Sequence, residues 1–300
     1  MHVFVTGATG LIGRAACAAL VARGDAVTAL SRSRGAAALL PGVRVLPGDP
    51  AVPGAWQDAL AAADACLHLA GEPVAQGRWT AERKRRIRES RVRSTENVAA
   101  VVGARGPKAL VSGSAVGFYG SRGDEELDEA SAPGGDFLAS VCREWEAAAA
   151  PAGARARVVL LRTGVVLARE GGALPKLVQP FRLFAGGPIG DGAFWMPWIH
   201  LADEVGLALL ALDDARAEGP LDAVAPAPAR NRDLARAVGA ALGRPSAIRT
   251  PAFALSLALG EMSSALLASQ RVLPRKALAL GYRFRFPALD GALRDLLRPA

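Results

Sequence analysis

Residues 3–13 read Val3-Phe4-Val5-Thr6-Gly7-Ala8-Thr9-Gly10-Leu11-Ile12-Gly13, and this stretch decides the fold. An apolar run followed at once by glycines in Gly-x-x-Gly-x-x-Gly spacing predicts a buried strand, a tight turn and a new helix. In that context the first glycine permits the turn, the second lets the backbone approach a pyrophosphate, and the third allows close helix–strand packing. The helix start offers unpaired N–H groups to phosphate. We therefore expect a dinucleotide site here rather than a glycine-rich turn without a ligand.

Apolar strands alternate with helical stretches through the first half, which predicts a parallel sheet covered on both faces. Strands are expected at Val3–Thr6, Ala26–Leu30, Val43–Leu46, Ala65–Leu69, Ala109–Ser112 and Val158–Arg162, with a short strand returning at Leu221–Ala225. Helices are expected at Leu11–Ala22, Trp56–Ala62, Ala81–Val102, Phe137–Ala150, Val205–Leu212, Asn231–Leu242, Phe253–Ser269 and Leu289–Leu297, and Tyr282–Phe286 is a candidate strand. The expected fold class is α/β, a doubly wound parallel sheet of the Rossmann type with its crevice at the carboxyl ends of the strands.

The regular alternation of strand and helix patterns ends after Arg162. Glycines and tryptophans crowd the stretch 186–198, which predicts loops near a site, with ordinary packing of a smaller lobe as an equal alternative. We expect an NADP-binding domain over 1–170 with a return segment at 197–230. A smaller, discontinuous C-terminal α/β lobe would take 171–196 and 231–300.

Composition narrows the class of protein. The chain has 300 residues, 51% of them hydrophobic, and a formal charge of +8. The absence of a long uncharged apolar run, and a start that leads directly into a strand, favour the cytoplasm over a membrane. Three dispersed cysteines and three dispersed histidines suggest neither disulfides nor a metal site. The basic run 83–88 is flanked by glutamates, so we interpret it as a solvated helix face, with phosphate contact as the alternative and nucleic-acid binding remote.

The end of the second predicted strand distinguishes the two nicotinamide dinucleotides. An acidic residue there would bind the ribose 2′-OH of NAD, whereas arginine pairs with the 2′-phosphate of NADP. This chain reads Ser31-Arg32-Ser33-Arg34, with no carboxylate expected at that corner, so we predict NADP(H). Asp49, which follows the third strand, is either an adenine contact or a simple turn residue.

Topology places further cofactor contacts at strand ends. Small residues in Leu69-Ala70-Gly71 would let the chain pass beside the ribose and pyrophosphate after the fourth strand. Ser112-Gly113-Ser114 ends the fifth strand and brings hydroxyl groups to the same edge.

These residues resemble a known superfamily, the extended and atypical short-chain dehydrogenases/reductases, and within it the "epimerase family" branch whose C-terminal portion is a domain of unknown function. The similarity spans nearly the whole chain. The motifs that carry it include residues 7–13, Leu69-Ala70-Gly71-Glu72, residues 112–120, Arg162-Thr163-Gly164, residues 186–190, Trp198-Ile199-His200 and Ser269-Gln270-Arg271.

The resemblance implies an NADP-binding fold and a C-terminal substrate lobe. It also implies that Ser31, Arg32, Leu69, Ala70, Arg91 and Arg162 touch the cofactor. Together with the residues taken from the turn and the strand ends, the expected cofactor-binding set is Gly7, Thr9, Gly10, Leu11, Ile12, Gly13, Ser31, Arg32, Leu69, Ala70, Gly71, Arg91, Ser112 and Arg162.

One departure from the superfamily limits the functional prediction. The usual tyrosine and the lysine four residues after it are replaced by Leu138 and Cys142, and leucine cannot exchange a proton. We name Tyr119 and Ser114 as catalytic candidates. Glu72 is a candidate base, and His200 is expected to be structural rather than catalytic.

Two functions follow from this pattern. The first is an NADPH-dependent oxidoreductase or epimerase acting on a small carbonyl or sugar-nucleotide substrate. The second is a non-catalytic NADPH-binding sensor, which needs the glycine turn but no proton donor. Fold-level analogy does not fix the substrate.

Overall fold

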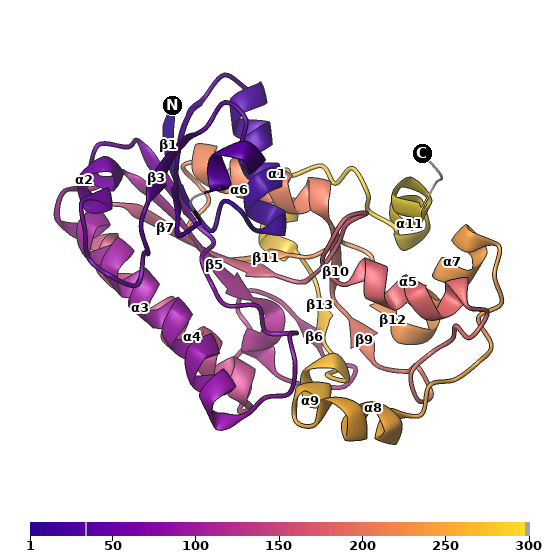
Figure 1. The fold of residues 1–300 in the computed structure, drawn as a ribbon. Helices are drawn as coiled ribbons and strands as arrows, with labels where there is room; N and C mark the ends of the chain where they lie inside the picture. Colours follow the sequence, from indigo (N-terminus) through magenta and orange to yellow (C-terminus); the bar gives the residue numbers. More distant parts are fainter. Residues whose placement is uncertain (34, 298–300) are drawn as a thin grey trace.

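A seven-stranded parallel sheet forms the centre of the computed structural model, which describes residues 1–33 and 35–297 (Figure 1). The strand order is β11-β7-β5-β4-β1-β2-β3. The strands are β1 (His2–Thr6), β2 (Ala26–Ser31), β3 (Arg44–Pro47), β4 (Ala65–His68), β5 (Ala109–Ala115), β7 (Arg157–Thr163) and β11 (Gly219–Ala223). The predicted α/β Rossmann class is confirmed, and Leu221 lies in the seventh strand, paired with Leu161.

Helices cover both faces of this sheet. Those of the main body are α1 (Leu11–Ala22), α2 (Trp56–Ala61), α3 (Ala81–Arg105), α4 (Phe137–Ala149) and α6 (Leu201–Asp213). Alternation along β1 shows the layering, because Val3 and Val5 pack in the cluster that contains α1 and α6, whereas Phe4 packs with α2 and α3. Both faces of the sheet are therefore buried.

The remaining elements lie beyond the carboxyl ends of the strands or beside β11 (Figure 1). The helices are α5 (Leu174–Arg182), α7 (Asn231–Leu242), α8 (Ala252–Leu259), α9 (Met262–Leu266), α10 (Arg275–Ala279) and α11 (Leu289–Leu297). Three two-stranded pairs join β8 (Val165–Leu167) to β10 (Trp198–His200), β9 (Trp195–Met196) to β12 (Ala229–Arg230), and β6 (Glu126–Leu127) to β13 (Arg271–Val272). Short 3-10 turns lie at Ala36–Leu39, Val116–Tyr119 and Ala150–Ala154. Helices α5, α7 and α11 share a second apolar cluster.

Two predicted elements of the last third were wrong. The helix expected over Phe253–Ser269 is broken into α8 and α9, because Gly260 between them has a φ of 61°. Tyr282–Phe286 forms no strand, since the N–H groups of Arg285 and Phe286 donate to the carboxylate of Asp203. In addition, Ala277 of α10 packs in the main core, so part of the segment assigned to the smaller lobe lies against the sheet.

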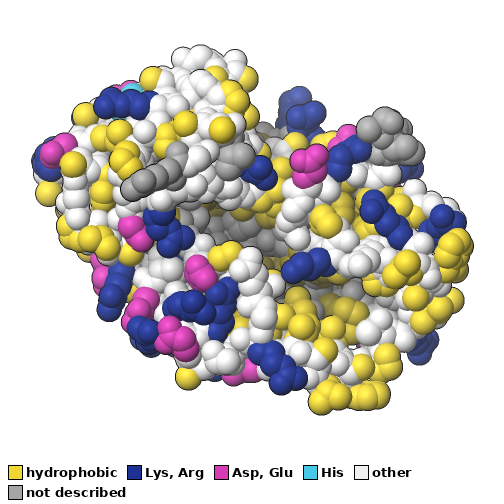
Figure 2. Space-filling model, viewed as in Figure 1, with side chains coloured by type: hydrophobic (Ala, Val, Ile, Leu, Met, Phe, Trp, Pro, Cys, Tyr) yellow, Lys and Arg dark blue, Asp and Glu magenta, His cyan; other side chains and the backbone are white. Residues whose placement is uncertain are grey.

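The carboxyl ends of β1, β4, β5 and β7 face a hollow on the surface between the main body and the helices α5, α8 and α9 (Figures 1 and 2). In the described ranges, 1–33 and 35–297, no helix has the length and apolar character needed to cross a membrane.

Candidate functional site

The glycine turn has the geometry expected of a phosphate cradle. Gly7 has a φ of 70°, and a Cβ there would lie 2.6 Å from the carbonyl carbon and oxygen of Leu69. A Cβ on Gly13 would lie 2.2 Å from the carbonyl oxygen of Gly7. Gly10 caps α1 without a side chain, so the first N–H groups of the helix have no side-chain acceptor. The cradle therefore fits a diphosphate, which would accept those N–H groups.

The corner after β2 contains the arginine predicted to select NADP. Ser31 is buried, and its Oγ accepts the N–H of Ser33 at 3.1 Å. The Arg32 side chain is 73% exposed, and its Nη1 lies 3.9 Å from Oδ2 of Asp49. Arg34, the second arginine of this motif, lies outside the described residues.

The expectation that no carboxylate occupies this corner was wrong. β2 and β3 are neighbours, with Ser31 opposite Pro47, so Asp49 two residues later lies beside Arg32. Its other oxygen accepts the N–H of Ala51 at 2.9 Å, as expected of a turn residue. The guanidinium is nevertheless free to turn to solvent, because the pair is long and both side chains are exposed.

The segment after β4 lies close to Arg91 of α3. A Cβ on Gly71 would lie 3.2 Å from Cζ of Arg91, so the guanidinium rests against the glycine. Nη1 of Arg91 donates to the carbonyl oxygens of Glu72 and Ile87, and the guanidinium lies 5.0 Å from the ring centroid of Trp145. Burial lowers the pKa of Arg91. The structure thus brings Arg91 to the same edge as Leu69, Ala70 and Gly71.

A chain of polar contacts starts at the end of β5. Ser114 donates to Oε1 of Glu146 on α4 at 2.6 Å, while Arg162 on β7 donates to both carboxylate oxygens at 2.8 Å. The Arg162 side chain is only 3% exposed, and the pKa of Arg162 is raised, chiefly by its hydrogen bond to Glu146 acting against desolvation. Ser112 is fully buried and its Oγ lies 3.5 Å from the Gly113 carbonyl oxygen. Ser114 and Arg162 therefore meet through a carboxylate that sequence reasoning missed.

Tyr119 continues this chain into the protein interior. It is fully buried, its hydroxyl accepts from Nη1 of Arg162 at 3.0 Å, and it donates to the Asp222 carboxylate at 2.8 Å. Burial raises the pKa of Tyr119, with the charge of Asp222 acting in the same direction. The same burial raises the pKa of Asp222. These contacts favour a structural role for Tyr119 over the proton transfer expected from its position.

Leu138 and Cys142 occupy the positions where the superfamily usually has its tyrosine and lysine, and both pack among apolar side chains. A Cβ on Gly117 would lie 3.3 Å from Cβ of Leu138, and Leu138 packs against the apolar cluster of Trp79, Ile87 and Met262. Cys142 is buried, and burial raises the pKa of its thiol to about 12. Neither residue offers a group that exchanges protons near neutral pH. Glu146 lies four residues after Cys142 and eight after Leu138, and this helical spacing is a signal in the sequence that could have identified it.

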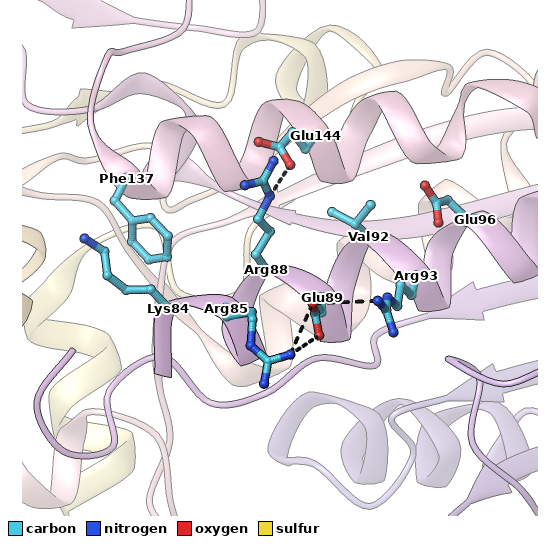
Figure 3. A pocket seen from close by; sticks show the side chains of 9 residues that line it. All are labelled: Lys84, Arg85, Arg88, Glu89, Val92, Arg93, Glu96, Phe137 and Glu144. Carbon is cyan, nitrogen blue, oxygen red and sulfur yellow. Dashed lines mark hydrogen bonds and ion pairs between the residues drawn. The ribbon is translucent and has the colours of Figure 1, made fainter. Parts of the chain in front are cut away.

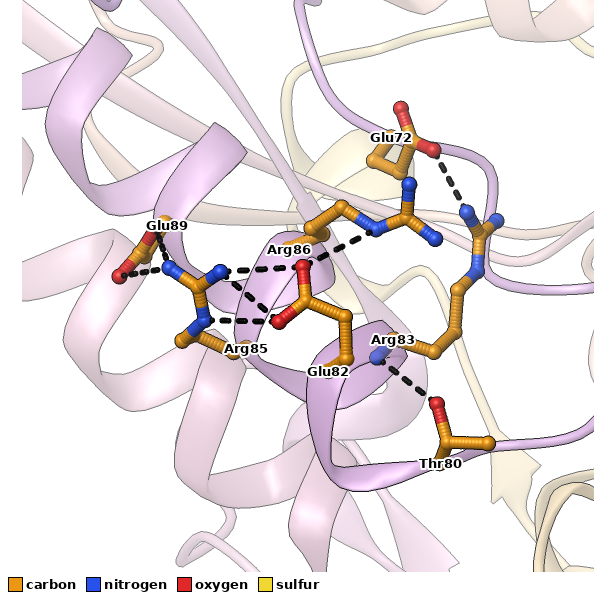
Figure 4. Close-up of polar contacts among 7 residues, drawn as sticks. All are labelled: Glu72, Thr80, Glu82, Arg83, Arg85, Arg86 and Glu89. Carbon is orange, nitrogen blue, oxygen red and sulfur yellow. Dashed lines mark hydrogen bonds and ion pairs between the residues drawn. The ribbon is translucent and has the colours of Figure 1, made fainter.

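Two other candidates have clear intramolecular roles. Oε1 of Glu72 accepts from Nη1 of Arg83 at 2.6 Å, an ion pair that holds the loop after β4 against α3 (Figure 4). Nδ1 of His200 accepts the N–H of Ala202 at 3.0 Å and so caps α6. This cap is a structural role of the kind expected of His200, and it explains why α6 begins at Leu201 rather than at Val205.

The exposed arginines of the basic run on α3 form a solvated, ion-paired face, whereas Arg83, the first residue of the run, is buried and paired with Glu72. Arg85 contacts both Glu82 and Glu89 on its own helix (Figure 4), and Arg88 pairs with Glu144 of α4 (Figure 3). A groove of about 490 Å³ lies along this face, lined mainly by these paired side chains. The charge of the run is therefore largely compensated within the protein.

Comparisons with known proteins define the family. Residues 3–224 match the model of the NAD dependent epimerase/dehydratase family, and residues 250–296 match a domain of unknown function, DUF1731. The chain belongs to the NAD dependent epimerase/dehydratase family. The resemblance to this branch of the short-chain dehydrogenases/reductases is thereby confirmed, its C-terminal domain included.

Individual relatives cover almost the whole chain. The Arabidopsis thaliana "Epimerase family protein SDR39U1 homolog, chloroplastic" is 40% identical over 304 residues, covering 99% of this chain and 87% of the relative. The crystal structure of human epimerase family protein SDR39U1 with NADPH is 37% identical, with a TM-score of 0.88 over 99% of both chains. A nucleoside-diphosphate sugar epimerase from Corynebacterium glutamicum is 40% identical with a TM-score of 0.80, over 99% of this chain and 58% of that one.

Proposed function

We propose that this protein binds NADP(H) in the crevice at the carboxyl edge of the sheet. The observation that carries the proposal is the cradle itself, in which Gly7 and Gly13 leave no room for a Cβ in front of an uncapped helix. The similarity to a human protein crystallised with NADPH supports the choice of cofactor. In this proposal the α1 amino terminus holds the diphosphate and Arg32 the 2′-phosphate.

The remaining predicted contacts divide into two groups. Arg91 lies beside Gly71 and keeps Nε and Nη2 without a protein partner among its hydrogen bonds in residues 1–33 and 35–297, so we assign it to the cofactor. Arg162 uses Nε, Nη1 and Nη2 on Glu146 and Tyr119. We therefore assign Arg162 to positioning the carboxylate rather than to the cofactor.

We further propose an oxidoreductase or epimerase activity on a small carbonyl or sugar-nucleotide substrate, with Ser114 and Glu146 in place of the absent tyrosine and lysine. The bound cofactor supplies or accepts the hydride. In the oxidative direction a substrate hydroxyl gives its proton to Ser114 Oγ, and Ser114 gives its own proton to Glu146 Oε1, 2.6 Å away. Reduction runs the same proton path backwards. Arg162 holds the carboxylate in place through two hydrogen bonds.

A second function, a non-catalytic NADPH sensor, is favoured by two observations. Leu138 and Cys142 leave the usual catalytic positions apolar, and the hydroxyl of Tyr119 is already engaged by Arg162 and Asp222. A protein that only binds the cofactor needs none of these groups to react.

The test combines cofactor titration with single-turnover measurements on a panel of carbonyls and sugar nucleotides. For the enzyme, Ser114→Ala and Glu146→Gln each lower turnover at least a hundredfold and leave the Kd for NADPH within about threefold. Ser140→Ala is the matched control, because Ser140 also donates to a glutamate of α4, Glu144, but outside the site. Tight binding without turnover on any substrate supports the sensor, and no binding of NADPH contradicts both functions.

A further inference from the structure

A fully buried histidine joins the two sides of the cofactor cradle. His68 is the last residue of β4, directly opposite Thr6 of β1 in the sheet. Its Nδ1 lies 2.6 Å from Oγ1 of Thr6, and its Nε2 lies 2.9 Å from Oγ1 of Thr95 on α3. All three side chains are 0% exposed. The sequence interpretation gave no role to any of them.

Two neighbouring contacts are compatible with one set of hydrogen-bond directions in this cluster. The N–H of Ala70 donates to Oγ1 of Thr6 at 3.3 Å, and the hydroxyl of Thr6 can donate its own hydrogen to His68 Nδ1. Nδ1 is then an acceptor, so the neutral ring has its proton on Nε2 and donates to Thr95. Burial lowers the pKa of His68 to about 4, which keeps the ring neutral at physiological pH. A single tautomer therefore satisfies the chain Ala70, Thr6, His68 and Thr95.

The four linked residues belong to the segments that would touch the dinucleotide. Thr6 immediately precedes Gly7 of the phosphate turn, and Ala70 immediately precedes Gly71. Thr95 lies one helical turn after Arg91, so the two residues share a face of α3. A neighbouring hydroxyl, Ser94 Oγ, lies 3.3 Å from Nε2 and already donates to the Ser90 carbonyl oxygen. One imidazole therefore links the phosphate turn, the loop after β4 and the helix that carries Arg91.

We propose that His68 is a positioning residue for the dinucleotide: through Thr6 and Thr95 it holds the phosphate turn and Arg91 at the separation that the cofactor requires. The inference rests on the proposed NADP(H) site and adds to it residues that do not touch the ligand. It also makes a specific prediction about the affinities for the two dinucleotides. Arg32 follows β2 and makes no hydrogen bond to this cluster within residues 1–33 and 35–297, so loosening the cluster weakens NADPH and NADH alike.

The chain contains a matched control for this hypothesis on the same face of the sheet. His2, at the amino end of β1, makes a hydrogen bond of 2.9 Å from Nε2 to Oγ1 of Thr28 on β2. Thr28 is 3% exposed, so it too is a buried threonine bonded to a histidine. Thr28→Val removes a contact to His2 at the amino end of β1, and Thr95→Val removes a contact to His68 at the carboxyl end of β4, so only the second lies at the cradle.

The experiment measures the Kd for NADPH and NADH, the unfolding temperature, and the amide exchange of Ala70 without nucleotide. We expect Thr95→Val and His68→Leu to weaken both cofactors at least tenfold with an unchanged NADPH to NADH ratio, and to speed exchange at Ala70. His68→Asn, which keeps an acceptor for Thr6, should recover part of the affinity lost in His68→Leu. Thr28→Val should lower the unfolding temperature without changing either Kd.

The inference is overturned if Thr95→Val lowers the unfolding temperature as Thr28→Val does but leaves both affinities and the exchange of Ala70 unchanged. If His68→Leu does not fold, the comparison of Thr95→Val with Thr28→Val still tests the inference. If the unmodified protein binds no NADPH, the proposed function fails, while exchange at Ala70 in the nucleotide-free protein still tests the positioning role.

Discussion

The two halves of the crevice differ in how they are built. On the β1 side, glycines remove side chains, a helix start faces outward, and the hydrogen bonds of His68 fix neighbouring segments. On the β5 and β7 side, which we call the reacting half, the side chains bond mainly to one another. They are those of Ser114, Glu146, Arg162 and Tyr119. In the first half the backbone N–H groups at the start of α1 have no side-chain acceptor, whereas in the second half the polar side chains are paired with one another.

This difference shows that cofactor binding and the proposed proton transfer depend on separate groups of residues in this protein. The cradle depends on backbone shape, which tolerates no added side chain at Gly7 or Gly13. The reacting half depends on the carboxylate of Glu146, whose hydrogen bonds can either transfer protons or hold neighbouring side chains in place. Variants that affect one half and spare the other therefore test the comparison.

The largest effect is expected from Gly13→Ala. A Cβ there would overlap the carbonyl oxygen of Gly7, so the turn and α1 must separate. We expect NADPH affinity to fall more than about a thousandfold, or ~4 kcal/mol, as measured by calorimetric titration. Gly291→Ala is the control, since a Cβ there meets no atom within 4 Å. Retained affinity in Gly13→Ala would refute the assignment of the turn to phosphate.

Arg162→Met tests the reacting half. It leaves the buried carboxylate of Glu146 without its partner, which should lower the free energy of unfolding by about 3 kcal/mol in urea titrations. The double variant Arg162→Met/Glu146→Gln should recover much of this loss, because the unpaired charge is gone. Arg85→Met, which removes an exposed arginine paired with Glu82, should have little effect. Equal losses in the single and double variants would contradict the pairing.

A buried acid next to the reacting half gives stability a pH dependence. Glu204 of α6 accepts from Thr163 Oγ1 at 2.7 Å, and burial raises the pKa of Glu204 to about 8. The unfolded chain loses this proton near pH 4.3, so between about pH 5 and pH 8 the folded state binds the extra proton. This contribution to stability therefore falls as pH rises, by roughly 1.4 kcal/mol per pH unit.

Glu204→Gln removes that slope because glutamine does not titrate. Between pH 5.5 and pH 7.5 the free energy of unfolding of the variant should rise by roughly 2 to 3 kcal/mol relative to that of the unmodified protein, measured by urea unfolding. Parallel pH profiles for the two proteins would show that Glu204 is ionised in the folded state.

The cradle could be predicted from sequence because its signals are local. The glycine spacing and the apolar run define β1 and α1, and α1 has the predicted bounds, Leu11–Ala22. The arginine at the end of β2 is equally local. The carboxylate of Asp49 beside Arg32 was missed, because that position depends on the pairing of β2 with β3, which spacing along the chain does not reveal.

The reacting half could not be predicted because its contacts join distant segments. Tyr119 and Asp222 are 103 residues apart in the chain, and Ser114 and Glu146 are 32 apart. Sequence spacing placed Tyr119 after a strand but could not show that Asp222 and Arg162 would engage its hydroxyl. The break at Gly260 was likewise hidden within a run of helix-favouring residues.

The measurement that tests the central claim most directly is calorimetric titration of NADPH and NADH against the unmodified protein and Arg32→Ala. Arg44→Ala serves as the control, because Arg44 is exposed at the amino end of β3, the end away from Arg32. We predict that NADPH binds at least about tenfold more tightly than NADH, a difference of ~1.4 kcal/mol, and that Arg32→Ala abolishes the difference while Arg44→Ala keeps it. Equal affinities in the unmodified protein, or a ratio unchanged by Arg32→Ala, would contradict the account.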